Sequence, residues 1–181
     1  MRAVFFSDIH GALSALARLM DWCGGNGVDR MFLLGDIFFP RSGTAEAAGA
    51  ASLLNRAGAH LSVVAGNCDS GADLAMLKIP AARDRMVFSL GGRTFFLTHG
   101  HIWNAWHLPP LPEGSVLVHG HTHVPEAREA GDGIIVFNPG SIGAPRRSAP
   151  RSFGCWEDGR LTVRRLEDGV EFMEFELPAG D

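Results

Sequence analysis

The stretch MRAVFFSDIH, residues 1–10, decides the fold of this chain. Its apolar run, Ala3–Phe6, has the length and the β-rich composition of a buried strand. Asp8 and His10 follow directly, so a carboxylate and an imidazole stand where this strand ends. In open α/β sheets, ligands bind beyond the carboxyl ends of the strands. The stretch therefore predicts a buried strand that delivers polar side chains to a binding edge.

The same arrangement recurs further along the chain. Later apolar runs lie at 31–34, 61–64, 94–97 and 116–118. The polar side chains that follow them are Asp36, Asn67, His99, His121 and His123. Strand ends that bring Asp, Asn and His to one edge predict a metal site, and the number of ligands favours two ions. Mixed oxygen and nitrogen donors suit Mn, Fe, Zn, Ni or Co better than Ca or Mg.

The first half of the chain predicts alternating strands and helices. Apolar residues at helical spacing indicate a helix over 13–20, and an Ala-rich segment capped by Thr44 indicates another over 45–56. These helices separate predicted strands near 2–7, 30–34 and 60–65. A β-α-β-α-β order predicts parallel strands with right-handed crossovers. A short helix is expected over 73–78.

The second half predicts shorter strands, near 86–90, 93–97, 115–119, 133–138, 152–157, 160–166 and 171–177. Glycine turns at 91–92 and 158–159 indicate hairpins. We expect exposed loops at 108–112 and 140–150. Together the elements predict an α/β fold with two sheets packed face to face and helices outside. Because no linker or repeat interrupts the pattern, residues 1–181 are expected to form a single domain.

The composition is that of an ordinary globular protein. Of 181 residues, 46% are hydrophobic and 20% are charged. The net charge of -4 argues against a nucleic-acid polymer as partner, although it is compatible with a small phosphate ester held by metal. No apolar stretch has the length of a membrane span, and the first residues do not resemble a secretory leader. Cys23, Cys68 and Cys155 form no CxxC pair, so we expect reduced thiols and a cytoplasmic location.

Five short motifs occur in a distinctive order: Asp8-Ile9-His10, Gly35-Asp36, Gly66-Asn67-Cys68-Asp69, Thr98-His99-Gly100-His101 and Gly120-His121-Thr122-His123. In this order they resemble the calcineurin-like metallophosphoesterase superfamily. The loop Phe137–Ser141 is similar to one in its small bacterial and archaeal phosphodiesterases, the YfcE-like branch. The resemblance runs from near residue 1 to about 145. It implies a four-layer αββα sandwich of two mixed sheets with flanking helices and a dinuclear centre on one edge.

The resemblance also implies a ligand set. One ion would take Asp8, His10, Asp36 and His123, and the other would take Asp36, Asn67, His99 and His121, with Asp36 as the bridge. Manganese is expected first, with Fe, Zn, Ni or Co as alternatives. Two divalent ions outweigh two carboxylates and a bridging hydroxide, so the centre would attract an anionic ester. A metal-bound hydroxide can attack phosphorus without a protein nucleophile.

One position departs from the family pattern. Many members carry histidine directly after Gly-Asn, where this chain has Cys68. A neutral thiol, with a free pKa near ~8.5, is a poor general acid for an alkoxide. His101 is a candidate substitute, or else a histidine that supports a ligand or simply lies on the surface. Asp69 either orients a ligand or Cys68, or caps a turn, and Arg41 is the candidate contact to substrate phosphate.

Other candidates remain open. Trp103, Trp106 and His107 either line the cleft or form an oligomer contact. For the basic loop with Arg146, Arg147 and Arg151, a solvated loop is favoured over a phosphate site. We predict a metal-dependent phosphodiesterase that acts on small phosphodiesters. The alternatives are a phosphomonoesterase and, as in the eukaryotic retromer, a non-catalytic protein-binding scaffold of the same fold.

Overall fold

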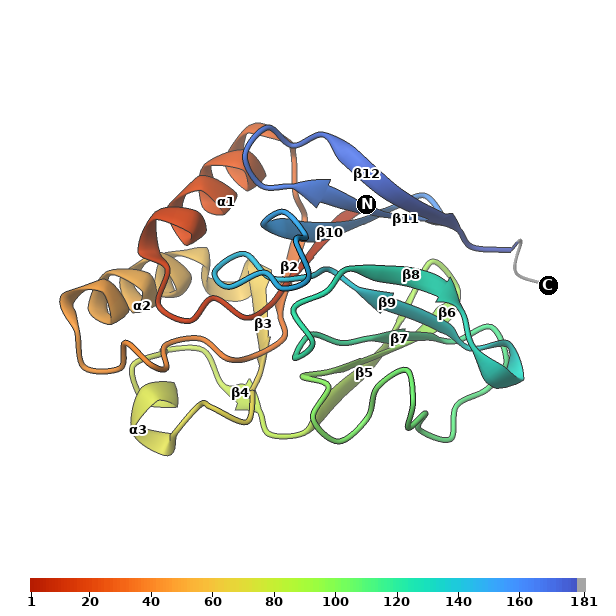
Figure 1. Cartoon of the computed structure of the whole chain (residues 1–181), viewed down its shortest axis with the longest axis horizontal. Helices are drawn as coiled ribbons and strands as arrows, with labels where there is room; N and C mark the ends of the chain where they lie inside the picture. The colour runs from red at the N-terminus through yellow and green to blue at the C-terminus, as the bar shows by residue number, and fades with distance from the viewer. Residues whose placement is uncertain (179–181) are drawn as a thin grey trace.

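The computed structural model describes residues 1–178 (Figure 1). Its strands and helices, in chain order, are β1 (Arg2–Phe6), α1 (Leu13–Gly25), β2 (Arg30–Leu33), α2 (Ala45–Ala57), η1 (Gly58–His60), β3 (Leu61–Val64), α3 (Gly71–Leu74), β4 (Ala81–Ala82), β5 (Arg85–Leu90), β6 (Arg93–Thr98), β7 (Val116–Val118), β8 (Glu126–Glu129), η2 (Gly131–Gly133), β9 (Ile135–Asn138), β10 (Ser152–Glu157), β11 (Arg160–Arg165) and β12 (Glu171–Glu176).

The strands form two sheets. The first has the order β12-β11-β10-β1-β2-β3-β4 and the second has the order β5-β6-β7-β9-β8. In the first sheet β1 to β4 are parallel, whereas β10, β11 and β12 are antiparallel. In the second sheet β6, β7 and β9 are parallel, with β5 and β8 antiparallel at the edges. Both sheets are mixed, as predicted.

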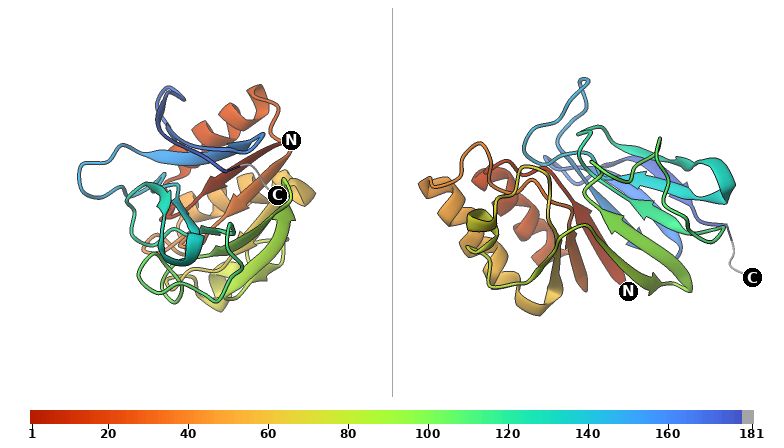
Figure 2. Two further views of the ribbon diagram at one scale, coloured as in Figure 1. Left: turned by 90° about the vertical axis from the view of Figure 1, so that its right-hand side faces the viewer. Right: turned by 90° about the horizontal axis from the view of Figure 1, so that it is seen from below.

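The first sheet lies between the long helices and the second sheet, as the right-hand view of Figure 2 shows. Successive side chains of a strand point to opposite faces. Val4 and Phe6 therefore face α1 and α2. Phe5 faces the second sheet, and its ring stacks on Phe95 of β6 at 6.1 Å and on its neighbour Phe32 of β2 at 5.3 Å between centroids. Because β1 is buried on both faces, its sequence is continuously apolar instead of alternating.

The outer face of the second sheet is covered by a loop. Trp103, Leu108 and Leu111 pack on Phe96 and Leu117 of β6 and β7. The α/β prediction of two packed mixed sheets is confirmed, and the layer over the second sheet is this irregular segment, with no helix among the described residues 99–115. The expectation of an exposed loop at 108–112 is wrong in part, because this segment shields an apolar sheet face.

Local sequence signals explain most elements. Thr44 caps α2 by accepting a hydrogen bond from the Ala47 N–H, as predicted. The short helix expected over 73–78 lies instead at Gly71–Leu74, because Ser70 and Asp73 form a capping box that starts it earlier. The sequence does not predict β4 or β8. β4 has only two residues, and the sequence of β8 is charged, so neither shows apolar alternation.

Parallel pairing brings the ends of β1, β2, β3, β6, β7 and β9 to one edge of the molecule. The loops there are joined by backbone hydrogen bonds, such as His10 N–H to Asp36 O at 3.0 Å and Gly120 N–H to His99 O at 2.8 Å. Within residues 1–178, no helix combines the length and the apolar character needed to cross a membrane. The single domain over 1–181 stays a prediction, and residues 179–181 lie outside the described part.

Candidate metal centre

The first group of predicted ligands lies where β1 and β7 end. Asp8 Oδ1 is 3.2 Å from His123 Nε2 and 3.9 Å from His10 Nε2. The Nε2 atoms of His10 and His123 are 3.4 Å apart. These donor atoms could hold one ion.

The second group surrounds His99. Its Nε2 lies 3.4 Å from Asp36 Oδ1, 3.0 Å from Asn67 Oδ1 and 3.2 Å from His121 Nδ1. The other Asp36 oxygen, Oδ2, lies 3.9 Å from His10 Nε2, in the first group. Asp36 thus stands between the two groups, which is the position that a bridging carboxylate requires. The structure brings all seven predicted ligands together at one edge.

Backbone carbonyls orient three of the four imidazoles. The Nδ1 atoms of His10, His99 and His123 lie 2.6, 2.6 and 2.5 Å from the carbonyl oxygens of Phe39, Leu34 and Ala144. A carbonyl only accepts hydrogen bonds, so each Nδ1 carries the proton in the neutral ring. The Nε2 lone pairs are then left facing the centre, the arrangement typical of metal-binding histidines.

These donor atoms fit divalent cations. Asp8 Oδ1 is buried and has no hydrogen-bond partner among the described residues. The two Nε2 atoms of His10 and His123 oppose each other as lone pairs, because their protons are on Nδ1. Buried acceptors that face one another without a donor are unfavourable. A cation between them removes this cost.

Local charges favour a cation as well. Burial raises the pKa of the Asp8 carboxyl. Burial acts in the same direction on Asp36, but the His99 ring and the Cys68 N–H together lower the pKa of Asp36 below its ordinary value. Burial of the His99 ring opposes its protonation, yet Asp36 and Asp8 raise its pKa overall. The carboxylates thus create a negative field that either a proton or a metal ion can neutralise.

The backbone is strained at most of these positions. Asp8, His10, Asp36, His121 and His123 have φ values of 56°, 49°, 54°, 66° and 62°. Positive φ is uncommon for residues other than glycine, and a strained backbone conformation costs on the order of 1–3 kcal/mol. Because five of the seven predicted ligands share this conformation, the fold uses it to aim their side chains at one point.

Glycines next to the ligands permit the strand ends to approach. A Cβ atom at Gly66 would overlap the Asp36 carboxylate, and one at Gly120 would overlap the Ser7 side chain. These two glycines, within the Gly66-Asn67 and Gly120-His121 motifs, are therefore required by close packing at the centre.

Asp69 holds the ends of β2 and β3 together. Its Oδ2 accepts hydrogen bonds from the N–H groups of Asp36 at 2.9 Å and Gly66 at 2.8 Å, and its Oδ1 accepts one from Ile37 N–H at 2.8 Å. Both oxygens are thus occupied by backbone donors. This geometry matches the orienting role that the sequence left open beside a turn cap.

Two buried side chains of the Phe137–Ser141 loop were missed as functional residues. Asn138 donates to Gly120 O at 2.9 Å and to Thr122 Oγ1 at 3.0 Å, and Ser141 donates to Asp8 O at 2.8 Å. Asn138 therefore holds the loop that carries His121 and His123, and Ser141 holds the loop that carries Asp8 and His10. The expectation of an exposed loop over 140–150 is therefore wrong at its start, where Ser141 is fully buried. The only sequence signal was Asn-Pro-Gly at a strand end.

The calcineurin-like phosphoesterase superfamily domain matches residues 1–158. The chain belongs to the calcineurin-like phosphoesterase superfamily. The predicted membership is confirmed, and with it the prediction of a metal-dependent phosphoesterase.

This phosphoesterase is similar to phosphodiesterase YfcE of Escherichia coli K12, with 37% identity over 173 residues, 93% of this chain and 94% of the relative. The solved structure of the E. coli phosphoesterase Yfce superposes with a TM-score of 0.91 and 35% identity, covering 98% of this chain and 100% of that chain. The YfcE-like branch is therefore confirmed. Vps29 of Entamoeba histolytica, complexed with zinc, shares the fold at a TM-score of 0.60 and 20% identity, covering 98% of this chain and 100% of that one.

The candidate catalytic residues of this phosphoesterase lie beside the candidate ligands. The exposed His101 ring is 5.6 Å from His99 between centroids, and burial together with the charge of His99 lowers its pKa. The Cys68 N–H donates to Asp36 Oδ1 at 2.9 Å. Burial and the neighbouring Asp36 raise the pKa of the Cys68 thiol to about 11, so it stays neutral at neutral pH.

Arg41 belongs to the loop between β2 and α2. Its side chain is exposed, and its aliphatic part lies over Gly11, the residue after ligand His10. The aliphatic part of Arg41 therefore lies against the loop that carries His10.

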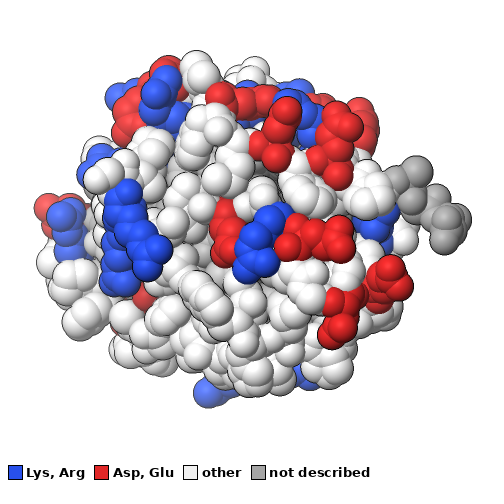
Figure 3. Space-filling model, turned by 45° about the vertical axis from the view of Figure 1, so that its right-hand side comes forward, with Lys and Arg blue, Asp and Glu red and all other residues white. Residues whose placement is uncertain are grey.

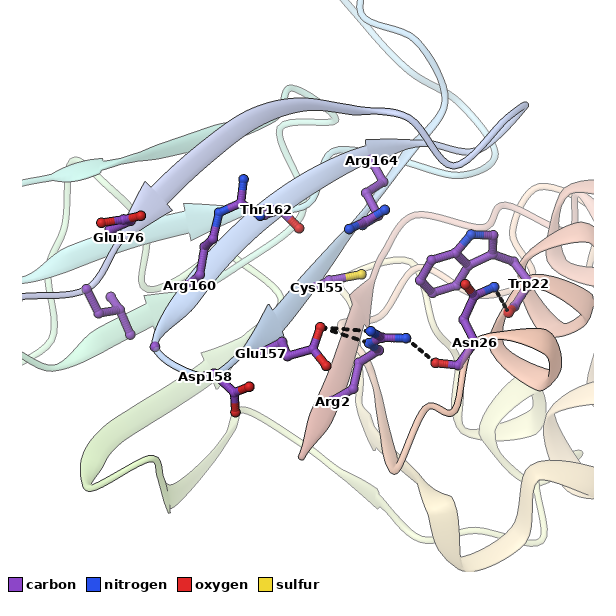
Figure 4. Close-up of a pocket in the computed structure, with 12 residues that line it drawn as sticks. Arg2, Trp22, Asn26, Cys155, Glu157, Asp158, Arg160, Thr162, Arg164 and Glu176 are labelled. Atoms are coloured by element: carbon purple, nitrogen blue, oxygen red, sulfur yellow. Dashed lines mark hydrogen bonds and ion pairs between the residues drawn. The ribbon is translucent and has the colours of Figure 1, made fainter.

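A hollow of about 510 Å³ lies at the amino end of β1, away from the candidate ligands (Figure 4). Arg2, Arg160 and Arg164 line it, and each guanidinium is paired with a glutamate: Arg2 with Glu157 at 2.8 Å, and the other two with Glu171. Its charges are balanced within the protein, in contrast to those of the metal centre.

Proposed function

We propose that this phosphoesterase hydrolyses small phosphodiesters with two divalent ions. The observation that carries the proposal is the position of Asp36, whose two oxygens face the two groups of candidate ligands, together with Asp8 Oδ1, which is buried and has no hydrogen-bond partner among residues 1–178. The match to the superfamily and the 37% identity to a phosphodiesterase support it.

The proposed ligand sets follow the two groups. Asp8, His10, Asp36 and His123 would hold one ion, and Asp36, Asn67, His99 and His121 the other. We propose manganese, because mixed oxygen and nitrogen donors suit it, with Fe, Zn, Ni or Co as alternatives. When bound, paired ions lower the pKa of a water and neutralise the charge of the phosphate.

The residues around the centre orient the proposed ligands and add no further negative charge to it. Asn67 offers a neutral oxygen, and the Cys68 thiol stays uncharged, so neither lowers the positive charge of a metal-loaded centre. Asp69 keeps Asp36 in place through three backbone hydrogen bonds. We assign to His101 the hydrogen bond to the leaving oxygen and to Arg41 a contact with the substrate phosphate. Since the thiol is a weak acid, esters with acidic leaving groups should react best.

The wider setting is also a proposal. Basic and acidic side chains are interspersed on the face shown in Figure 3, which supports a small substrate over a nucleic-acid polymer. The three free cysteines support a cytoplasmic location. We propose that residues 1–181 act as one domain. The mass of the protein in solution will show whether it forms a homo-oligomer.

The test compares bis(p-nitrophenyl) phosphate with p-nitrophenyl phosphate on the manganese-loaded protein. We expect the diester to be preferred, and Asp36→Asn to lower its turnover by about 10³-fold while Glu157→Gln, at the other end of β1, leaves it unchanged. A preference for the monoester would indicate a phosphomonoesterase. Hydrolysis of neither ester by protein with both ions bound would indicate a scaffold and contradict the proposal.

A further inference from the structure

A hollow of about 610 Å³ adjoins the metal centre on the side of His121. Trp106 lines one side, and Arg146 and Arg147 line another. Val124 and Pro125 add an apolar part. Small-molecule sites typically measure about 300–1,000 Å³, so this space suits a nucleotide better than a lone phosphate.

The Trp106 side is a rigid turn. The backbones of Asn104 and His107 exchange two hydrogen bonds of 3.1 Å, and Asn104 Oδ1 accepts the Trp106 N–H at 2.9 Å. Asn104 Nδ2 donates to Gly100 O at 2.9 Å, directly after ligand His99. The turn is therefore tied to the metal centre, while its indole is 77% exposed. An exposed aromatic ring on an ordered turn can serve as a stacking surface for a base.

The arginine side is tied to the other ligand group. Arg146 N–H donates to His123 O at 3.2 Å, and Ala149 N–H closes the turn onto Arg146 O at 3.0 Å. Arg147 and Ser148 form the tip with φ values of 53° and 60°.

The arginines of this hollow are not neutralised. Neither Arg146 nor Arg147 forms an ion pair within residues 1–178, whereas Arg2 and Arg160 do. Glu126, which also lines the hollow, is paired with Arg128 at 2.6 Å. The hollow thus offers positive charge to an anion.

We propose that this hollow binds the nucleoside part of the substrate, with the base on Trp106 and a second phosphate on Arg146 and Arg147. The inference rests on the proposed function and names its substrate class: phosphodiesters of nucleotides that carry another phosphate. The diester phosphorus lies at the metal centre, and the hollow next to His121 takes the retained substituent. Water forms the new P–O bond, the bond to the leaving oxygen breaks, and that oxygen takes a proton.

The test uses three p-nitrophenyl phosphodiesters with the same leaving group, whose other substituent is methyl, thymidine-5′ or 3′-phosphothymidine-5′. Wild-type kcat/KM should rise along the series. Trp106→Ala should lower the thymidine-to-methyl ratio roughly tenfold, a typical loss for one stacking contact. The double variant Arg146→Gln/Arg147→Gln should remove the gain from the 3′-phosphate. Arg151→Gln, in the same loop but outside the hollow, should change neither ratio.

Binding of thymidine 3′,5′-bisphosphate, measured by calorimetry, gives a readout without turnover. We expect weaker binding in both hollow variants and unchanged binding in Arg151→Gln. Equal losses on all three esters, or a wild type that does not discriminate among them, would overturn the inference. The inference would also be overturned if Trp106→Ala changed the oligomeric mass and lowered the rates on all esters alike. If no ester is hydrolysed, the proposed function fails, and bisphosphate binding alone decides whether the hollow takes nucleotides.

Discussion

The two ends of β1 differ in how their polar groups are satisfied. At the amino end Arg2 pairs with Glu157 at 2.8 Å, and neighbouring arginines also face glutamates. At the carboxyl end Asp8 Oδ1 has no partner among residues 1–178, and the Nε2 atoms of His10 and His123 face each other at 3.4 Å. Clusters of charged residues occur at both ends. Among residues 1–178, the guanidinium groups at the amino end each pair with a glutamate, although Arg164 Nε has no partner, whereas the buried carboxylate and imidazoles at the carboxyl end meet no cation. Such unpaired acceptors are typical of a binding site rather than of a structural network.

The strongest test of this difference removes one histidine from each end. His99→Ala should abolish the second ion and lower phosphodiesterase activity more than about 100-fold, since even residues that only support ligands account for about 10–100-fold in activity. His60→Ala should change neither, because that exposed ring lies away from the candidate ligands, with its Nδ1 3.1 Å from Asp29 O. Elemental analysis and initial rates provide the measurement. An unaltered metal content in His99→Ala would contradict the ligand assignment.

The effect of Asp8→Asn on the melting temperature should depend on whether metal is bound. Each ion at 100 times its Kd stabilises the folded state by about 2.7 kcal/mol, so chelation of both ions should lower the melting temperature by roughly 10–20 °C. Without metal, Asp8→Asn should melt no lower than the wild type, because it removes a buried charge whose Oδ1 has no hydrogen-bond partner among residues 1–178, although Oδ2 accepts the His121 N–H. With metal it should melt lower. Scanning calorimetry with and without chelator would show this reversal, and its absence would mean that Asp8 is not a ligand.

Replacing glycine by alanine should lower the free energy of unfolding at the metal centre but not in α1. Gly66→Ala should destabilise the fold by roughly 1–3 kcal/mol, because its Cβ would overlap the Asp36 carboxylate. Gly24→Ala, in α1 with open space around it, should be neutral or stabilising by roughly 0.5–1 kcal/mol. Urea unfolding would measure both. Equal free energies of unfolding for the two variants would show that the strand ends are less closely packed.

The smallest effect is expected at the compensated end. The hydrogen bonds with Arg160, and then the charge of Arg164, lower the pKa of Glu171 in the folded state despite its partial burial. This pairing stabilises the fold above the unfolded pKa and is lost as the pH falls through the folded pKa. Glu171→Gln should therefore lower the melting temperature at pH 7 by only about 1–2 °C. The difference from the wild type should shrink below about pH 4.5. A difference that grows in acid would contradict this.

The sequence predicted the parts that depend on local chemistry. Apolar runs indicated β1, β2 and β3, Thr44 indicated the start of α2, and the turns Gly91-Gly92 and Asp158-Gly159 indicated the hairpins. It also indicated the seven candidate ligands, because each comes in the loop after a recognisable strand. The short and charged strands β4 and β8 were not predicted, since pairing with a neighbouring strand, and not their own pattern, makes them strands.

By itself, the sequence determined which atoms are offered to a metal and in what order, because donor type and position after a strand are local properties. Only the tertiary structure decided that Asp36 lies between two groups, that Asn138 and Ser141 brace the ligand loops, and that Trp106 and Arg147 line one hollow. These relations join residues far apart in the chain. They depend on the parallel register of the strands and on loop conformations with positive φ, which no local pattern specifies.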